Sequence, residues 1–328
     1  MIEATMPSEH WQHFRPDRAN PFPADVVAQA DRELDNLAAL LEGRGIQVFR
    51  PQQVNWHEVG GYTAAMPRDG LITVGNHLIE APFAWRCRRN EIDLAYGRVL
   101  ADLEKDASVR VFRAPKRFEK DTLCDLSDVA GHPWVINDTR PAFDAADFMR
   151  FGKVLIGQFS HVTNAKGVEY LRQCLPTGYV VEMLTVNDPN AMHIDATLLP
   201  LREGLLAYNP KKTSQDALRR ISVLRDWDLR PFPLEPKVPD YPPLFMTSPW
   251  LALNLLVLDG KHVLVERQDE ECARWIESLG MIAIPCPLRH VNSIGGSFHC
   301  ATVDLVREPG MVPNEAGDDG PKKNGAWC

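Results

Sequence analysis

Four segments of the chain carry polar, reactive side chains where a protein core would be apolar. They are 67–69 (PRD), 143–147 (FDAAD), 190–197 (NAMHIDAT) and 295–302 (GGSFHCAT). In the last segment Cys300 follows a histidine and opens the strand-like run ATVDLV. A thiol between a loop and a strand can point into a cleft, where its thiolate is a good nucleophile. A small, buried and unreactive cysteine is the alternative interpretation.

His193 and Asp195 are two residues apart, and in an extended segment such residues face the same side. The spacing predicts that both enter one cleft, His193 as acid and base and Asp195 as a charged anchor. A pair on a surface loop is one alternative. A metal site is another, but no third and fourth ligand follow at a recognisable spacing, so we expect no metal and no other cofactor. Asp69 and Asp144, taken alone, are also typical of turns and helix caps.

Taken together, a cysteine, a histidine and several aspartates predict nucleophilic attack on a carbon bound to a cation. Carboxylates pair in bidentate fashion with planar guanidinium groups. A thiolate that attacks a guanidinium carbon needs carboxylates to hold that plane. It also needs a histidine to protonate the departing amine.

The composition limits the function. Of 328 residues 45% are hydrophobic and 24% charged, which excludes a disordered, collagen-like or disulfide-scaffold protein. The net charge is −8 without a basic block, so we expect neither nucleic acid nor an anionic membrane as partner. No run approaches about 18 apolar residues, so we expect no membrane span. Seven cysteines without paired spacing, and an N-terminus without the apolar segment of a secretory signal, predict reduced thiols in the cytoplasm.

Hydrophobic periodicity predicts a repeated order of elements. Helices are expected over 24–43, 90–105, 167–174, 214–224 and 270–279. Strands are expected over 46–49, 70–75, 109–113, 153–159, 179–185, 229–234 and 281–285, with hairpins over 196–208 and 253–266. Units that open with an antiparallel pair suit a ring of small mixed sheets better than a doubly wound parallel sheet. The pair Gly295-Gly296 lacks the spacing of a phosphate-binding loop.

The chain resembles the amidinotransferase family, the L-arginine:glycine amidinotransferases above all. The resemblance runs in family order through PRDGLITVGNHLIEAPFAWRCR, PAFDAADFMRFG, NDPNAMHIDAT, LAYNP, MTSPWLALNLLVLDGKHVLVE and GGSFHCATVDLVR. It implies an α/β fold, namely a five-bladed α/β propeller (the pentein fold) of ββαβ units around a central active site. It also implies transfer of the amidino group of L-arginine to an amine acceptor through a covalent intermediate, with release of L-ornithine.

Matched to the family's motifs, Cys300 resembles the nucleophile, His193 the acid and base, and Asp144 the residue that orients the histidine. Asp69 and Asp195 resemble the carboxylates that grip the guanidinium. The family lines its substrate pocket at the positions of Asn190, Met192, Thr247 and Ser248. Relatives also suggest a homodimer. Of the seven cysteines only Cys300 then needs a chemical explanation.

Two features depart from the family. Lys212 replaces an arginine that anchors a substrate carboxylate, and a lysine keeps the charge but loses the bidentate fork. Residues 1–23 form a polar extension without the family's first apolar strand. We therefore expect a single domain over 24–308, whose blade between the chain ends lacks one edge strand. A disordered tail is expected over 309–328.

The acceptor stays open at this stage. Met192 favours a small acceptor such as glycine, because relatives specific for glycine carry methionine at this position. β-Alanine, taurine, lysine or another amine remain alternatives. A hydrolase similar to arginine deiminase, in which water resolves the intermediate, is a second function to test. A non-catalytic arginine-binding protein is a third.

Overall fold

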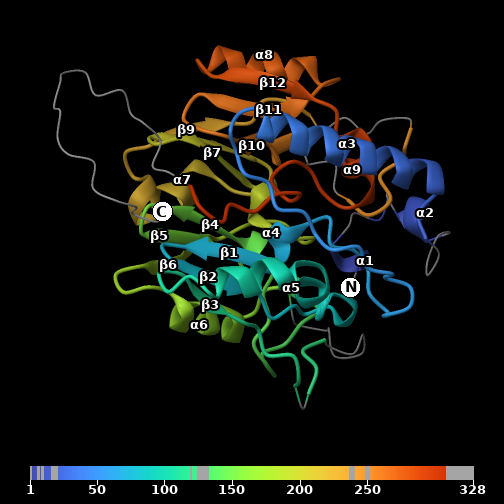
Figure 1. Ribbon diagram of the computed structural model, residues 1–328. Coiled ribbons are helices and arrows are strands. Elements are labelled where there is room, and N and C mark those ends of the chain that lie inside the picture. The colour runs from blue at the N-terminus through green and yellow to red at the C-terminus, as the bar shows by residue number, and fades with distance from the viewer. Residues whose placement is uncertain are drawn as a thin grey trace.

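The computed structural model describes residues 2–5, 8, 11–15, 21–118, 120–123, 133–235, 241–247 and 252–307. Ser248, the expected tail 309–328 and part of the expected extension 1–23 lie outside this set. The described residues form an α/β fold of four three-stranded sheets (Figure 1). None of their helices is both long enough and apolar enough to cross a membrane.

Each sheet has the same ββαβ order, in which an antiparallel pair is followed by a helix and a third strand parallel to the second. The first unit holds β1 (Leu71–Val74), β2 (His77–Glu80), α5 (Glu91–Leu103) and β3 (Arg110–Phe112). The second holds β4 (Phe148–Phe151), β5 (Val154–Gly157), α6 (Ala165–Cys174) and β6 (Val180–Met183). The third holds β7 (Leu198–Arg202), β8 (Leu205–Tyr208), α7 (Gln215–Arg219) and β9 (Asp228–Pro231). The fourth holds β10 (Leu256–Val257), β11 (His262–Glu266), α8 (Glu270–Ser278) and β12 (Ile282–Cys286).

Local sequence explains why the units repeat. The hairpin turns of the first three units place Gly75, Gly152 and Gly204 at φ of 58°, 59° and 78°, a left-handed conformation that favours glycine. Three crossing helices begin after an N-cap residue whose side chain accepts a backbone N–H of the first turn. These caps are Asn164, Ser214 and Asp269.

The first strands of the four units face a common centre. A cavity of about 140 Å³ lies there, and each first strand contributes to its lining. The contributing residues include Ile72 of β1, Met149 of β4, Leu199 of β7 and Leu256 of β10. The four units therefore share this cavity, and their hydrophobic clusters pack around it.

Short helical turns come directly before three of these first strands. They are α4 (Pro67–Gly70) before β1, η3 (Ala145–Asp147) before β4 and η4 (Ile194–Ala196) before β7. Further short helices are α1 (Ile2–Thr5), α2 (Trp11–Phe14), η2 (Arg86–Arg88) and η5 (Ser222–Leu224). Because the first strands face the centre, the turns that lead into them bring polar residues from distant parts of the chain to one place.

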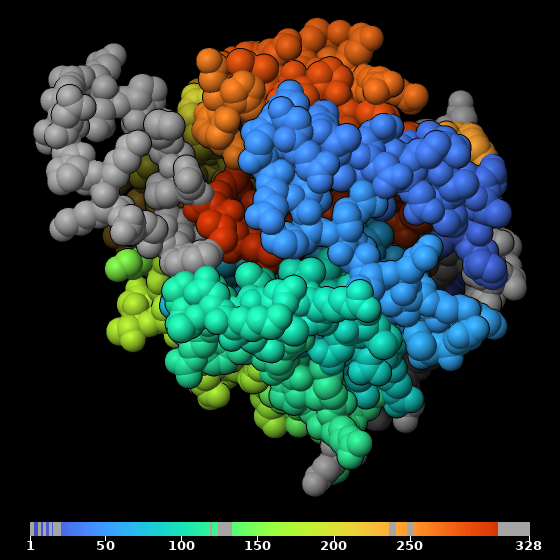
Figure 2. Space-filling model, viewed as in Figure 1, coloured from blue at the N-terminus to red at the C-terminus, as the bar shows by residue number. Residues whose placement is uncertain are grey.

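The two ends of the chain meet through helices. The long helix α3 (Ala24–Glu42) packs on α9 (Arg289–Ile294), where the Glu33 carboxylate accepts the backbone N–H groups of His290 and Val291 at 2.8 and 3.1 Å. In the space-filling view the blue N-terminal part lies directly against the orange and red C-terminal part (Figure 2). This contact joins the fourth unit to the beginning of the chain.

Several sequence predictions are wrong in detail. Neither residues 46–49 nor the run 301–306 forms a strand. We expected the blade between the chain ends to lack one edge strand, but the described residues form no sheet there at all. A strand needs a hydrogen-bonded neighbour, and Ile46 and Phe49 remain 40% and 48% exposed. The predicted helix 214–224 is divided into α7 and η5, and the Arg219 guanidinium donates to the carbonyls of Leu224 and Trp227 after the break. The strands β2 and β4, which contain charged residues, were not predicted.

Candidate active site

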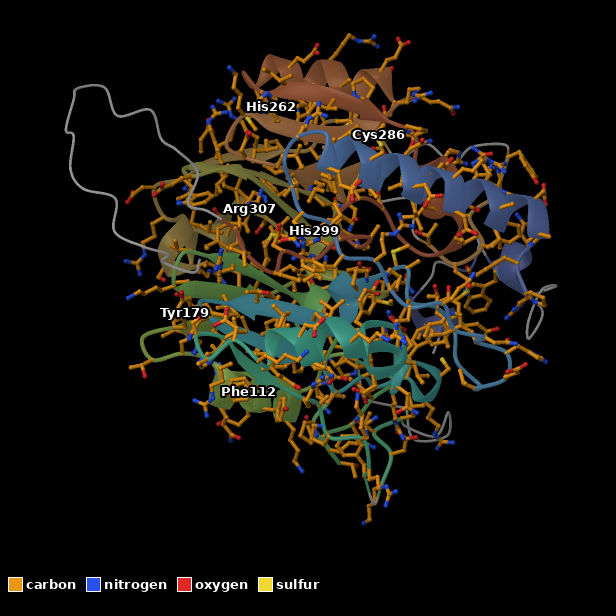
Figure 3. The ribbon with its side chains drawn as sticks, viewed as in Figure 1. Phe112, Tyr179, His262, Cys286, His299 and Arg307 are labelled. Carbon is orange, nitrogen blue, oxygen red and sulfur yellow. The ribbon has the colours of Figure 1, made fainter. Side chains whose placement is uncertain are left out.

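The turns before three first strands bring four predicted residues together with Cys300. Asp69 comes from α4, Asp144 precedes η3, and Asp195 belongs to η4. His193 and Cys300 complete the cluster, and all five residues are buried. His299, next to Cys300 in the chain, marks this place near the middle of the molecule (Figure 3).

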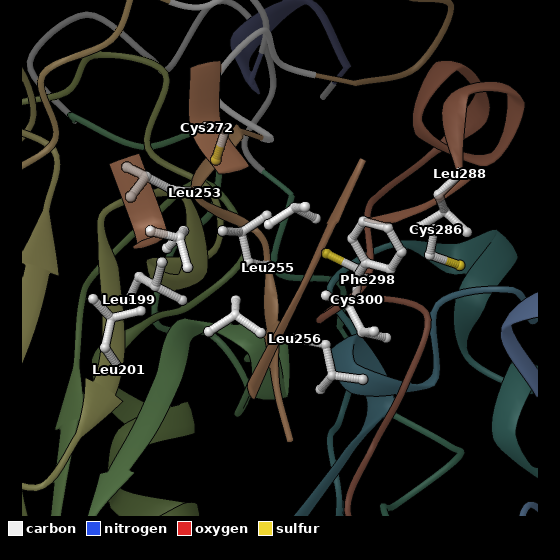
Figure 4. Packing of buried hydrophobic residues seen from close by; sticks show 14 of the residues in the cluster. Leu199, Leu201, Leu253, Leu255, Leu256, Cys272, Cys286, Leu288, Phe298 and Cys300 are labelled. Carbon is white, nitrogen blue, oxygen red and sulfur yellow. The ribbon is translucent and has the colours of Figure 1, made fainter. Parts of the chain in front are cut away.

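Cys300 lies in a turn and not at the start of a strand as predicted. Its backbone N–H donates to Oδ1 of Asn254 at 3.1 Å, and its Sγ lies 3.1 Å from Nδ2 of the same side chain. The sulfur also lies 3.5 Å from Oδ2 of Asp195. On the other side Cys300 belongs to the apolar cluster that contains Phe298 and Leu255 (Figure 4).

The glycine pair before Cys300 has a packing reason. A Cβ atom added to Gly296 would lie 2.7 Å from Cβ of Cys300 and 2.5 Å from the sulfur of Met66. Any side chain at this position would push the thiol or its neighbour aside. The glycine in GGSFHC therefore allows the chain to pass close to the reactive sulfur.

His193 sits between two carboxylates. Its Nε2 lies 3.0 Å from Oδ2 of Asp144, and its Nδ1 lies 3.6 Å from Oδ1 of Asp69. Its φ is 63°, so the segment is not extended as predicted, and Asp195 reaches the site through the turn η4. A non-glycine residue in this conformation is strained, and such strain is common where a side chain must be aimed at a site.

Charge explains the protonation of the histidine and the cysteine. Burial disfavours the imidazolium of His193, but Asp69 and Asp144 outweigh it and raise the pKa of His193 well above its ordinary value. Burial, assisted by the charge of Asp195, raises the pKa of the Cys300 thiol to about 12, against the lowering effect of His193. The resting site thus combines an imidazolium that can give a proton with a thiol that must first lose one.

Two carboxylate oxygens in the described part of the site accept no hydrogen bond, although they are buried. They are Oδ1 of Asp69 and Oδ1 of Asp144. Burial raises the pKa of Asp69 further than His193 and Arg88 lower it. An unsatisfied buried acceptor costs about 1–3 kcal/mol, so these oxygens favour a ligand with several N–H donors.

Asp195 faces the sulfur with a different partner. Its Oδ2 lies 2.8 Å from Nδ1 of His299. Burial alone would raise the pKa of Asp195, but the contact with His299 outweighs it and the pKa is lowered. Asp195 is therefore a carboxylate anion next to the thiol.

Sequence reasoning missed the cation that holds these acids. Arg88 donates to Asp69 at 2.8 Å and to both oxygens of Glu91 at 2.7 and 2.8 Å, and it lies 3.6 Å from Asp144. Burial opposes the charge of Arg88, yet the carboxylates raise its pKa well above the ordinary value. The signal was present in RCRRNE, where a glutamate follows an arginine at a spacing of three.

A second missed group supports the loop of Asp144. The carboxylate of Asp147 accepts hydrogen bonds from Gln158, Ser160 and Thr163 at 2.9, 2.6 and 2.5 Å. The Thr163 hydroxyl in turn accepts the backbone N–H of Asp144 at 3.3 Å. Burial raises the pKa of Asp147 to about 6. This network fixes the backbone that carries Asp144.

The residues expected to line the substrate pocket are held differently. The Asn190 amide donates to the backbone carbonyl of Ala4, in α1, at 2.8 Å. The Lys212 ammonium lies 2.9 Å from a carboxylate oxygen of Asp188. Thr247 is buried and Met192 is half-buried. Ser248 lies outside the described residues, so its expected position is not tested.

Three side chains of the site have the types and distances of a metal site. The candidate ligand atoms of Asp69, His193 and Cys300 all lie within 4.8 Å of one another. A thiol binds a metal only as the thiolate. Arg88 already places a positive charge 2.8 Å from Asp69. A second cation is therefore more easily placed as a bound guanidinium, which brings its own N–H donors, than as a divalent ion.

Known proteins resemble this chain over most of its length. No protein-family model matches it. It is 38% identical to the L-arginine:L-lysine amidinotransferase of Pseudomonas savastanoi pv. phaseolicola, over 93% of this chain and 86% of that protein. It is 35% identical to the mitochondrial glycine amidinotransferase of Xenopus tropicalis, over 93% of this chain and 76% of that protein. The solved structure of SxtG, an amidinotransferase from Microseira wollei in the saxitoxin biosynthetic pathway, matches with a TM-score of 0.83 and 32% identity, covering 94% of this chain and 93% of that one.

Proposed function

Because this chain belongs to the amidinotransferase family, and is therefore a transferase, we propose that it moves the amidino group of L-arginine to an amine acceptor and releases L-ornithine. One observation carries the proposal. A buried thiol has a histidine and carboxylates around it, and two of those carboxylates keep an oxygen without a hydrogen bond. A planar guanidinium supplies the missing donors and holds its carbon next to the sulfur.

The first half-reaction begins when arginine binds. The guanidinium charge, placed among Asp69 and Asp195, favours loss of the thiol proton of Cys300 to solvent. The thiolate forms a bond to the guanidinium carbon. The bond from that carbon to the side-chain nitrogen of arginine then breaks, and the His193 imidazolium gives its proton to this nitrogen. Ornithine leaves, and the amidino group remains on Cys300 as a cation.

The second half-reaction reverses the roles. The neutral imidazole of His193 takes a proton from the incoming amine, whose nitrogen forms a bond to the amidino carbon. The carbon–sulfur bond breaks and the thiolate returns. Asp144, 3.0 Å from Nε2 of His193, keeps the ring oriented in both steps.

We propose a small primary amine, such as glycine, as the acceptor. Relatives named for lysine and for glycine match at 38% and 35% identity, so identity alone does not select between them. The half-buried Met192 directly precedes the catalytic histidine and takes up space beside it. We further propose that the four units and the α3–α9 contact form a five-bladed propeller, whose fifth unit consists of the two chain ends.

An acceptor screen tests this function. L-arginine is supplied with a panel of amines that includes glycine and lysine, and ornithine, citrulline and guanidino products are measured by mass. We expect ornithine to form only in the presence of an acceptor, together with one guanidino product. Citrulline that forms at the same rate without any amine would show a hydrolase instead.

A second measurement isolates the covalent step. Intact-mass analysis after mixing with arginine alone should show one amidino adduct. Cys300→Ser should show none, whereas Cys286→Ser, a change to another buried cysteine, should keep it. If the unmodified protein forms no adduct at any pH between 7 and 10, the transferase proposal is wrong and a non-catalytic arginine-binding protein is favoured.

A further inference from the structure

The Asn254 side chain forms hydrogen bonds with both the backbone and the sulfur of Cys300. The backbone N–H of Cys300 donates to Oδ1, and this contact fixes which end of the amide faces the sulfur. The N–H group of Nδ2 therefore points toward Sγ at 3.1 Å. Asn254 is 1% exposed and Cys300 is 3% exposed, so no solvent competes for this hydrogen bond.

The position of Asn254 repeats a pattern of the fold. Asp69 precedes β1 by two residues, and Asp195 precedes β7 by three. Asn254 precedes β10 by two. The fourth unit thus places an amide where the first and third place a carboxylate. An amide can donate to a sulfur anion, which a carboxylate cannot do.

From this geometry we infer that Asn254 is a further catalytic residue, whose amide stabilises the thiolate of Cys300 and holds it for attack; the inference rests on the proposed function. The two contacts of the sulfur have opposite effects. Asp195, an acceptor at 3.5 Å, favours the protonated thiol. Asn254, a donor, favours the thiolate.

Arginine binding changes the balance between these contacts. When a guanidinium pairs with Asp195, this carboxylate no longer accepts a hydrogen bond from the thiol of Cys300. The amide of Asn254 remains, because its other end is fixed to the backbone of Cys300. The same amide also helps to keep Asp195 ionised through a hydrogen bond. Asn254 therefore links the carboxylate that receives the substrate to the sulfur that attacks it.

Alkylation of Cys300 tests the inference without any need for turnover. The rate of Cys300 modification by iodoacetamide is measured from pH 6 to 11 by mass analysis of its peptide, in the unmodified protein, Asn254→Ala and Asn254→Asp. For Asn254→Ala we expect a rate about tenfold lower at pH 8, since one charge-assisted hydrogen bond to the thiolate is lost. For Asn254→Asp, which keeps the shape and the acceptor for the Cys300 N–H, we expect a larger fall because a carboxylate repels the thiolate.

The control is Asn164→Asp, at another buried asparagine that caps α6. It keeps the helix cap but loses the amide donors, so it should change the thermal midpoint and leave the alkylation profile unchanged. An unchanged profile in a folded Asn254→Asp protein would overturn the inference. Because alkylation needs no acceptor, this result is separate from a failure of the acceptor screen, which would overturn the transferase function alone.

Steady-state kinetics give a second readout. In Asn254→Asp we expect kcat to fall at least tenfold, with a pH profile shifted to higher pH, while the KM for arginine changes less than threefold. A merely structural role would alter KM and stability and would not shift the pH profile. A fall in kcat without that shift would also overturn the inference.

Discussion

The reactive cluster around Cys300, called the inner wall below, and the residues proposed to line the substrate pocket, called the outer wall, are held in different ways. On the inner wall, His193, Asp144, Asp69 and Arg88 bind one another within 3.6 Å, and Asn254 fixes Cys300. On the outer wall, Asn190 binds the backbone of α1 instead of a neighbour in the site. Lys212 there binds Asp188.

The difference separates chemistry from recognition. The inner wall is preorganised, because its charges already lie where an amidino carbon and its leaving nitrogen would need them. If Asn190 and Lys212 bind substrate as proposed, they must exchange contacts within the chain for contacts with substrate, which reduces the net gain in binding. We therefore expect changes to the inner wall to have large effects on stability and catalysis, and changes to the outer wall to have smaller effects on KM.

The largest expected effect is on folding. Arg88→Met removes the cation from Asp69, Glu91 and Asp144, and we expect it to lower the free energy of unfolding by about 3–5 kcal/mol, because buried carboxylates are left without a partner. Chemical denaturation measures this loss. Arg86→Met is the matched control, since the Arg86 side chain is 72% exposed and pairs with Asp121. A loss below about 1 kcal/mol in Arg88→Met would contradict a preorganised inner wall.

The second prediction uses pH. The pKa of His193 is raised in the folded protein, so its contribution to stability is complete below the unfolded pKa of about 6.5 and is lost as pH rises toward the folded value. One such group lowers the free energy of unfolding by about 1.4 kcal/mol per pH unit in this range. Denaturation curves from pH 6 to 9 should show this slope, and His193→Gln should reduce it. An equal slope in both proteins would mean that the imidazole is not charged at rest.

Part of the candidate site and part of the fold could be predicted from the sequence. Asp69, Asp144, His193, Asp195 and Cys300 were identified from short motifs, and the structure places them together. Each motif can be recognised on its own, because its reactive side chains differ from the apolar residues around them in the sequence. In the third and fourth units the order of hairpin, helix and strand was visible for the same reason, because periodicity and turn residues are local signals, whereas β2 and β4 of the first two units were not predicted.

The remaining features depend on contacts between distant segments. Arg88 and Asn254 are important because of the residues that they contact in the folded chain. In the sequence, Asn254 is only a polar residue within the apolar run LNLLVL. The strand expected over 46–49 failed because a strand requires a partner that periodicity does not reveal. The contact of Asn190 with Ala4 spans 186 residues and follows no motif. Sequence therefore identified most residues of the inner wall but not Arg88 or Asn254, and the residues expected to line the substrate pocket stay a prediction.

The third prediction concerns Lys212. If this lysine exchanges Asp188 for a substrate carboxylate, Lys212→Met should raise the KM for arginine about tenfold and change kcat less than threefold, which corresponds to one charge-assisted contact. Lys211→Met is the matched control, because the neighbouring ammonium lies 2.6 Å from exposed Glu235. Initial rates at varied arginine measure both constants. An unchanged KM for arginine in Lys212→Met would show that Lys212 does not bind the substrate carboxylate.

The smallest expected effect is at α1. Ala4 accepts the Asn190 amide at 2.8 Å, and Thr5 is 9% exposed, so residues 2–5 cover part of the outer wall. If substrate binds Asn190 as proposed, it must displace one neutral hydrogen bond there, worth about 1 kcal/mol. Deletion of residues 2–5 should therefore lower the KM for arginine about two- to fivefold and leave kcat unchanged. Arg15→Ala, which breaks the exposed pair with Glu3 and the contact with the Trp11 ring, should leave both constants unchanged. A higher KM for arginine after the deletion would show instead that substrate contacts α1 directly. The outer wall would then be as preorganised as the inner wall.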